Sequence, residues 1–288
     1  MRQGMKLGQV IALIVSVFFS SCSIIDPAED IPAYLHIDKY TLTTNFDQGT
    51  ASHNITDVWV YLDQEIVGVY ELPATIPVLG QGSNKITIRP GIKINGIAST
   101  RIYYPFFKAG EITLDLVPAN VDTLQPATVY NTNVIFKYIE GFEDPGIPFA
   151  STPTSDTGMF KTNAPELVFE GTSSAAIILD KDRPYFAAVS NNAYKLPQGA
   201  IPVYLEMNFR NDTPLVVGLI SNALGGTSKL EILVLNPTPT WKKVYVNLGP
   251  TINRQSQVID FNLYLSAGLE TGKEKGEIYL DNLKLLHY

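Results

Sequence analysis

Residue types that enzymes use for chemistry are sparse in this sequence. It contains three histidines, which are His36, His53 and His287. They share no spacing typical of metal ligands, and no HExxH, GxSxG, Walker or GxGxxG pattern is present. The sequence therefore offers no nucleophile, metal site or phosphate-binding loop that a motif would identify.

Two carboxylates in the stretch LDKDRP could act together. Asp180 and Asp182 could serve as the acid pair of glycoside hydrolysis, which needs two carboxyl groups at a set separation. A lysine and an arginine alternate with them, however, and this alternation favours a charged hairpin turn. We therefore expect a protein that is not an enzyme.

Cys22 is the only cysteine, and it ends an apolar leader. Arg2 and Lys6 precede the apolar run LGQVIALIVSVFF, and two serines then lead into the cysteine. The run is too short to span a bilayer, which needs ~20 apolar residues, and this order of residues is typical of a secretory signal. A single cysteine also excludes an intramolecular disulfide.

The small pair directly before Cys22 resembles the lipobox of bacterial lipoproteins, with Phe19 where leucine is commonest. The resemblance implies that residues 1–21 are removed as a signal peptide and that the Cys22 thiol carries diacylglycerol. Acyl chains such as palmitate, at ~0.8 kcal/mol per buried CH₂, would then hold the protein on a membrane. The alternative is an ordinary signal peptide with an incidental cysteine.

An acidic, proline-bearing tether follows at 22–32. Its acidic residues resemble the surface-export signals of some Gram-negative lipoproteins, so we expect lipid anchoring in the outer membrane and exposure at the cell surface. The whole chain has a formal net charge of −7 and no cluster of lysine and arginine. A net acidic surface repels nucleic acid, so we exclude nucleic acid as a partner.

The hydrophobic pattern predicts an all-β protein with two β-sandwich domains. Short alternating runs recur between Gly, Pro and Asn clusters, and no sustained 3.6-residue period occurs after the leader. The region 33–118 has the size and strand spacing of an Ig-like sandwich, and 119–126 lacks a strand pattern, which predicts a linker. The region 127–288 contains about nine predicted strands, including 167–169, and suits a jelly roll.

A segment of the first region carries turn residues in a recurring order. VWVYLDQEIVGVYELPATIPVLGQGSNKITIRPG resembles PEGA-type and related surface β-sandwich modules, although Gln64 stands where a glycine normally follows the turn aspartate. The residues that carry the likeness are Asp63, Gly68, Pro73, Pro77, Gly82 and Gly91.

Five stretches in the second region follow a familiar order. They are YIEGFEDPG, FEGTSSAAIIL, VYLEMNFR, TWKKVYVNL and GEIYLDNLKLL. This order resembles carbohydrate-binding-module-like jelly rolls of the galactose-binding-domain type, in which an early Phe-Glu and a late Asp-Asn often hold a structural calcium. The resemblance implies Glu143 and Asp281 as calcium ligands, which are of the type that calcium prefers, and no other cofactor. The alternative is that Glu143 begins a turn and Asp281 ends a strand.

The predicted ligand-binding face comes from alternation in two strands. In Val203 to Arg210, alternate residues are expected to face the core. In Val258 to Leu265, the same alternation places Asp260, Asn262 and Tyr264 on the outward face. If the strands are neighbours, tyrosines and polar side chains would share one surface, as glycan binding requires. The predicted ligand residues are Tyr204, Glu206, Asn208, Arg210, Asn262 and Tyr264. The alternative is a solvated sheet face with cross-strand pairs.

Aromatic residues elsewhere bear on a second hypothesis. The cluster 103–107 is expected to pack in the core and between the domains, and Trp241 is expected in the core. Our first hypothesis is a lipid-anchored, non-catalytic surface protein that binds glycan through the jelly roll. The alternative is a structural accessory subunit that docks on an outer-membrane transport, secretion or adhesion complex, with an apolar patch near 103–107 exposed.

Overall fold

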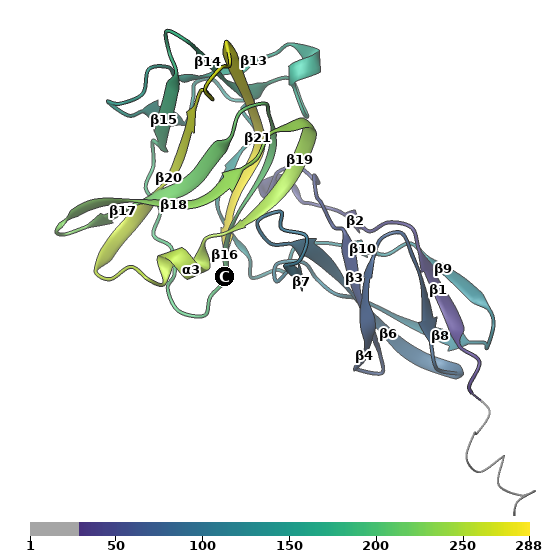
Figure 1. Ribbon diagram of the computed structural model, residues 1–288. Helices are drawn as coiled ribbons and strands as arrows, with labels where there is room; N and C mark the ends of the chain where they lie inside the picture. The colour runs from purple at the N-terminus through teal and green to yellow at the C-terminus, as the bar shows by residue number, and fades with distance from the viewer. Residues whose placement is uncertain (1–28) are drawn as a thin grey trace, which may run out of the picture.

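The computed structural model describes residues 29–288, so Cys22 and its leader lie outside the described residues. Strands dominate the described chain, and the predicted all-β class is confirmed (Figure 1). The helical segments described are η1 (Phe46–Gln48), η2 (Pro165–Leu167) and α3 (Gly249–Ile252). Within residues 29–288, no helix is long and apolar enough to cross a membrane.

The first domain contains three sheets. One has the strand order β5-β1-β9, and another has the order β4-β3-β6-β7 with β8 also paired to β6, while β2 and β10 form a two-stranded sheet. The strands are β1 (Ala33–Ile37), β2 (Thr41–Leu42), β3 (Asp57–Leu62), β4 (Glu65–Glu71), β5 (Ala74–Val78), β6 (Gly82–Lys93), β7 (Arg101–Tyr103), β8 (Gly110–Leu116), β9 (Val121–Leu124) and β10 (Ala127–Thr128).

Alternation in the sequence sets the buried faces of these strands. Ala33, Leu35 and Ile37 in β1 are fully buried, and so are Val58 and Val60 in β3. All five belong to one apolar cluster enclosed between the sheets. Successive side chains of a strand point to opposite faces, so the alternation predicts the buried set directly.

Local turn chemistry explains part of the PEGA-like order. Asp63 and Gln64 both have positive φ, at 46° and 78°, and join β3 to β4, which is the backbone of a tight hairpin turn. Gly91 in β6 has no room for a side chain, since an added Cβ would lie 2.9 Å from the Cβ of Asp57. The PEGA-type likeness itself stays a prediction.

The second domain consists of two sheets, which we call sheet I and sheet II. Sheet I has the order β13-β14-β21-β16-β19 with β11 paired to β21, and sheet II has the order β12-β15-β20-β17-β18. The strands are β11 (Ile135–Glu140), β12 (Phe149–Ser151), β13 (Met159–Thr162), β14 (Ser174–Asp180), β15 (Tyr185–Ser190), β16 (Val203–Asn211), β17 (Leu215–Ala223), β18 (Gly226–Leu235), β19 (Thr238–Asn247), β20 (Val258–Gly268) and β21 (Lys275–His287).

The core of the second domain lies between sheets I and II. Leu205 and Met207 of β16 point into it from sheet I, and Leu263 and Leu265 of β20 point into it from sheet II. The inward residues expected for both strands are therefore confirmed. Two sheets packed face to face make this domain a β-sandwich.

The segment 119–126, predicted as a linker without strands, contains β9. Residues 121–124 pair with β1 in parallel, and β10 directly afterwards pairs with β2 in the first domain. Ala119 has a positive φ of 65° where the chain turns into β9. The prediction of no strand fails because an edge strand of four residues leaves too short a pattern to recognise.

Three local expectations in the second domain are also corrected. The strand expected at 167–169 is absent, because Leu167 ends η2 and residues 168–169 are not in a strand. Asp180 and Arg183 do not close a hairpin, because β14 belongs to sheet I and β15 to sheet II. The Asp180 carboxylate instead holds the turn by accepting the Arg183 N–H at 2.8 Å. Trp241 packs against Phe169, with ring centroids 5.4 Å apart, and lies outside the core cluster.

Candidate functional site

The two strands with predicted ligand residues belong to different sheets. β16 pairs with β19 and β21 in sheet I, whereas β20 pairs with β15 and β17 in sheet II. Their outward side chains therefore lie on opposite sides of the sandwich. The expected common surface is not formed, and the β16 row and the β20 row have separate surroundings.

The first domain covers most of the β16 row. Tyr204, Glu206 and Asn208 are only 3%, 0% and 2% exposed. Ser52 of the first domain donates a hydrogen bond to Oδ1 of Asn208 at 2.9 Å, and the ring of Tyr204 packs edge-on against Tyr104 with centroids 5.3 Å apart. These three predicted ligand residues lie in the domain interface, while Arg210, the next outward residue, is partly exposed.

The aromatic cluster 103–107 forms the first domain's side of this interface. Tyr104, Phe106 and Phe107 are buried, and Phe106 packs against Tyr204 with centroids 5.9 Å apart. Tyr103, in contrast, is 42% exposed. The expected inter-domain packing is confirmed for the three buried rings.

Glu206 is the charged centre of the domain interface. Its Oε1 accepts hydrogen bonds from the hydroxyls of Tyr104 at 2.9 Å and Tyr130 at 3.0 Å. The Nζ of Lys243 lies 3.1 Å from Oε2 as an ion pair, without the alignment of a hydrogen bond. The buried Lys284 donates from its Nζ to the carbonyl of Thr50 at 2.6 Å. Loss of one member would leave a buried charge uncompensated.

Burial changes the acidity of these interface groups. Burial and the nearby Glu206 carboxylate raise the pKa of Tyr104 and Tyr130 well above 10. Burial lowers the pKa of Lys284 to about 8, although the attraction of Glu206 opposes this. These shifts follow from the burial of all three side chains in the domain interface.

Backbone contacts also join the two domains. The N–H of Asn95 donates to the carbonyl of Tyr245 at 2.9 Å, and the side-chain oxygen of Asn95 accepts from the N–H of Asn247 at 2.9 Å. Ile94 forms a parallel β-bridge with Tyr245. Side-chain and backbone contacts together fix the first domain on the outward face of sheet I.

The outward face of sheet II carries the remaining predicted residues. Tyr264 lies in the centre of the sheet, and its hydroxyl is 3.3 Å from the hydroxyl of Tyr185 on β15. The Nζ of Lys229 on β18 lies 5.6 Å from the centroid of the Tyr264 ring, and Tyr264 is only 3% exposed. Between them Gly218 of β17 has no room for a side chain, because an added Cβ would lie 2.3 Å from the carbonyl of Leu230.

A group of amide and carboxylate side chains lies beside these tyrosines. Asn222 of β17 donates to Oδ1 of Asp260 at 2.7 Å and to Oδ1 of Asn262 at 2.8 Å. Asn262 donates in turn to the carbonyl of Ser190 at 2.8 Å. The hydrogen bonds hold these side chains in fixed orientations across three strands. Sequence analysis did not identify Asn222, Tyr185 or Lys229, because strand order decides which residues meet.

Local contacts also shift the acidity of groups on this face. The hydrogen bond with Tyr264, and then burial, raises the pKa of Tyr185. The hydrogen bond to Glu231 raises the pKa of Lys229. The face therefore presents phenols, amides and one Lys-Glu pair, which together offer hydrogen-bond donors and acceptors.

The predicted calcium ligand Glu143 is occupied by hydrogen bonds. Its Oε1 accepts from the backbone N–H groups of Thr172 at 2.9 Å and Ser173 at 3.1 Å. Burial acts to raise the pKa of Glu143, but these hydrogen bonds outweigh it and lower the pKa. Glu143 therefore anchors the loop that precedes β14.

Asp281, the other predicted calcium ligand, has donors of its own. Oδ2 accepts from Ser174 Oγ at 2.6 Å, and Oδ1 accepts from the Asn282 N–H at 2.7 Å. Burial raises the pKa of Asp281 to about 6. Among residues 29–288, no three His, Cys, Asp or Glu side chains are grouped to hold a metal ion. Calcium binding by Glu143 and Asp281 stays a prediction.

The three histidines lie on separate elements. His36 contacts Thr75 at 2.9 Å, His53 lies near the domain interface, where burial lowers its pKa, and His287 lies at the end of β21. They do not converge on a common site in the part of the chain that the structure describes.

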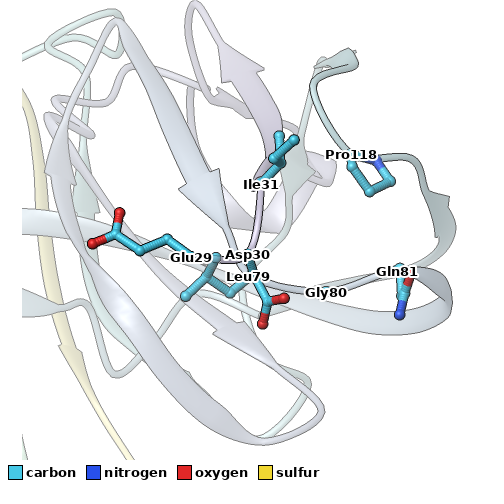
Figure 2. Close-up of a pocket in the computed structure, with 7 residues that line it drawn as sticks. All are labelled: Glu29, Asp30, Ile31, Leu79, Gly80, Gln81 and Pro118. Atoms are coloured by element: carbon cyan, nitrogen blue, oxygen red, sulfur yellow. The ribbon is translucent and has the colours of Figure 1, made fainter. Parts of the chain in front are cut away.

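A hollow of about 410 Å³ lies at the end of the first domain where the described chain begins. Figure 2 shows the side chains around it. Ile31 and Leu79 are 64% and 67% exposed, and the carboxylates of Glu29 and Asp30 lie beside them. This end of the domain is the one nearest in sequence to Cys22.

Comparisons with known proteins concern the fold. No protein-family model and no curated protein matches the sequence. Among solved structures, the chain is similar to the xylan-binding domain from CBM 22, with 13% identity, a TM-score of 0.38, and coverage of 52% of this chain and 93% of that domain.

Two further solved structures show a likeness of the same kind. One is the family 11 carbohydrate-binding module from Clostridium thermocellum in complex with a β-1,3-1,4-mixed-linked tetrasaccharide, at 9% identity, a TM-score of 0.36, and coverage of 51% of this chain and 92% of that one. The other is described as one of the carbohydrate-binding modules from the β-sandwich superfamily, at 11% identity, a TM-score of 0.33, and coverage of 80% and 84%. At such values the likeness is one of β-sandwich architecture and says nothing of a ligand.

Proposed function

We propose that this protein binds glycan, without catalysis, through the outward face of sheet II. The observation that carries the proposal is a contrast between the two faces: the first domain packs on the outward face of sheet I and not on that of sheet II, although Tyr264 on sheet II is itself only 3% exposed. The outward face of sheet II carries two phenols, two amides, a carboxylate and a Lys-Glu pair. Sugars present hydroxyl groups that both donate and accept, and these side chains match that need.

Part of the face is already ordered for binding. Asn222 and Asn262 are held by hydrogen bonds before any ligand arrives, so less side-chain freedom is lost on binding. Lys229 covers the ring of Tyr264, and its exposed side chain can move aside at small cost. A sugar would then reach the ring face of Tyr264 and the hydroxyl of Tyr185 together.

The proposed attachment to the membrane depends on Cys22. We propose that a lipid on this residue holds the protein in the outer membrane with the second domain toward the cell exterior. Between Cys22 and Glu29 the chain spans at most roughly 25 Å when extended. The first domain would then act as a spacer, and its packing on sheet I would hold sheet II in one orientation.

The test uses a soluble form that begins at Asp30. A glycan array and affinity electrophoresis in gels with xylan or mixed-linkage β-glucan should detect binding, and Tyr264→Ala and Tyr185→Ala should each weaken it. Thr113→Ala, on the exposed edge of β8, serves as the matched control. Absence of binding to every glycan would reject the proposal, and so would binding that both tyrosine variants leave unchanged.

A second candidate function is docking on an outer-membrane protein assembly. It is favoured by the outward face of β3, β4, β6 and β7, where Tyr103, Ile66 and Val69 are 42%, 55% and 39% exposed. Arg89 lies 4.9 Å from the ring of Tyr103 on the same face. This role predicts that Tyr103→Asp prevents site-specific crosslinking to envelope proteins in cells, while Tyr264→Ala does not.

A further inference from the structure

A small hollow lies on the outward face of sheet I, beyond the edge of the domain interface. It encloses about 180 Å³, and Arg210, Asp212, Glu277 and Tyr279 are among the residues that line it. Sites for drug-sized ligands occupy roughly 300–1,000 Å³. This hollow therefore suits a single ring or the end of a chain.

Arg210 and the buried Tyr279 line the hollow, and Trp241 lies next to Arg210 outside its lining. The guanidinium carbon of Arg210 lies 4.8 Å from the ring centroid of Tyr279 and 5.9 Å from that of Trp241. Phe169 packs beside Trp241 and is 36% exposed. Nε1 of Trp241 has no hydrogen-bond partner among the described residues, which is uncommon for a covered N–H group.

Charges around the hollow balance each other. Arg210 donates to the carbonyl of Glu166 at 2.9 Å and forms no ion pair in the part of the chain that the structure describes. Glu277 pairs with Lys275, and Asp212 accepts the N–H of Glu277 at 2.6 Å. The lining thus combines the guanidinium group of Arg210 with the carboxylates of Asp212 and Glu277, and Lys275 outside the lining pairs with Glu277. Neighbouring donors and acceptors suit neutral hydroxyl groups, which do both.

We propose that this hollow is a second carbohydrate subsite, which binds one neutral sugar ring. Arg210 would donate to one hydroxyl while Asp212 or Glu277 accepts from its neighbour. The inference rests on the proposed function for its ligand class alone. It places the subsite on the opposite sheet from Tyr264, so one molecule would contact glycan on two faces.

The chain has only two tryptophans, Trp59 and Trp241, and this permits a direct optical test. In a Trp59→Phe background, Trp241 is the sole tryptophan and reports on the hollow. We expect a saturable change in its emission on titration with one or more of the methyl glycosides of glucose, xylose, galactose and mannose. Arg210→Lys and Glu277→Gln should each raise the apparent Kd by roughly tenfold, since the first loses the planar guanidinium donors and the second loses a charged acceptor.

Controls separate this subsite from the face of sheet II. Tyr264→Ala should leave the emission change intact while it weakens polysaccharide binding, and thermal melts should show that each variant is folded. No emission change with any of the four glycosides would overturn the inference. It would also be overturned if Arg210→Lys and Glu277→Gln leave the titration unchanged, or if Tyr264→Ala abolishes it. None of these results decides whether glycan binds to sheet II, because polysaccharide binding measures that separately.

Discussion

The second domain has two outward sheet faces built from similar residues and put to different uses. On sheet I the row from Tyr204 to Asn208 is buried by the first domain, with Glu206 fully buried between tyrosines and lysines. On sheet II, Glu231 and Lys229 form an ion pair at 2.9 Å that stays about half exposed. A Glu-Lys pair therefore joins the two domains on sheet I, whereas on sheet II a similar pair faces solvent and is available to a ligand.

This difference shows that an outward polar row does not by itself define a binding site. What matters is whether another part of the chain covers it. The domain interface takes the β16 row from Tyr204 to Asn208 on sheet I, whereas Arg210 and Phe160 remain at least partly exposed on the same face. The first domain does not pack on the outward face of sheet II, which is why the proposed glycan site lies there.

The largest expected effect comes from a matched pair of charge removals. Glu206→Gln should lower the free energy of unfolding by about 3–5 kcal/mol, because it leaves buried lysines uncompensated. Glu231→Gln, its counterpart on sheet II, should change it by at most about 1 kcal/mol. Urea unfolding of both variants measures this. Equal losses for the two would show that the domain interface does not bury Glu206.

The pH dependence of stability sharpens the same contrast. Burial lowers the pKa of Lys284 to about 8, so between pH 8 and the ordinary value of 10.5 the unfolded state binds more protons than the folded state. The free energy of unfolding should therefore rise with pH across this window, by about 2 kcal/mol. The buried tyrosines oppose this above pH 10. Lys284→Met should flatten the rise between pH 8 and 10, and an unchanged slope would show that Lys284 is solvated.

A smaller effect is expected from the amide group on sheet II. Asn222→Ala removes the hydrogen bonds to Asp260 and Asn262, so those side chains lose their fixed orientation. Glycan affinity should fall roughly tenfold, while stability changes little. Calorimetry with a bound oligosaccharide and a parallel thermal melt measure the two quantities. An equal affinity in the variant would exclude this group from the site.

The smallest effect is expected from calcium. Glu143 and Asp281 already accept hydrogen bonds from backbone and hydroxyl donors, so chelation should shift Tm by less than about 2 °C. Differential scanning calorimetry with EDTA and with added calcium measures this. A rise in Tm that saturates with calcium would restore the metal site that the family resemblance implies.

Much of the fold could be predicted from the sequence, because strand alternation directly encodes a buried face. Leu205 and Met207, and likewise Leu263 and Leu265, point inward as expected. Short strands escaped prediction: β9 and β12 span four and three residues. Three or four residues leave too little periodicity to separate a strand from a loop.

The candidate site was less predictable, because it depends on long-range order. Alternation correctly turns Tyr204 and Tyr264 out of the core, but it does not say that β16 and β20 lie in opposite sheets. Alternation also does not show that residues 104–107 cover the outward face of β16. Trp241 was expected in the core because large aromatic residues are usually buried there. It lies outside the core cluster, next to Arg210 and Phe169, and alternation does not reveal these long-range partners.

The most direct test is a map of where a glycan touches the protein. In ¹H–¹⁵N spectra of the soluble form, titration with an oligosaccharide that the array identifies should shift the amide signals of β15, β17, β18 and β20. The amides around Tyr204 and Glu206 in β16 should stay unchanged, because the first domain covers them. Shifts concentrated on β16, or on the first domain, would contradict the assignment of the glycan site to sheet II.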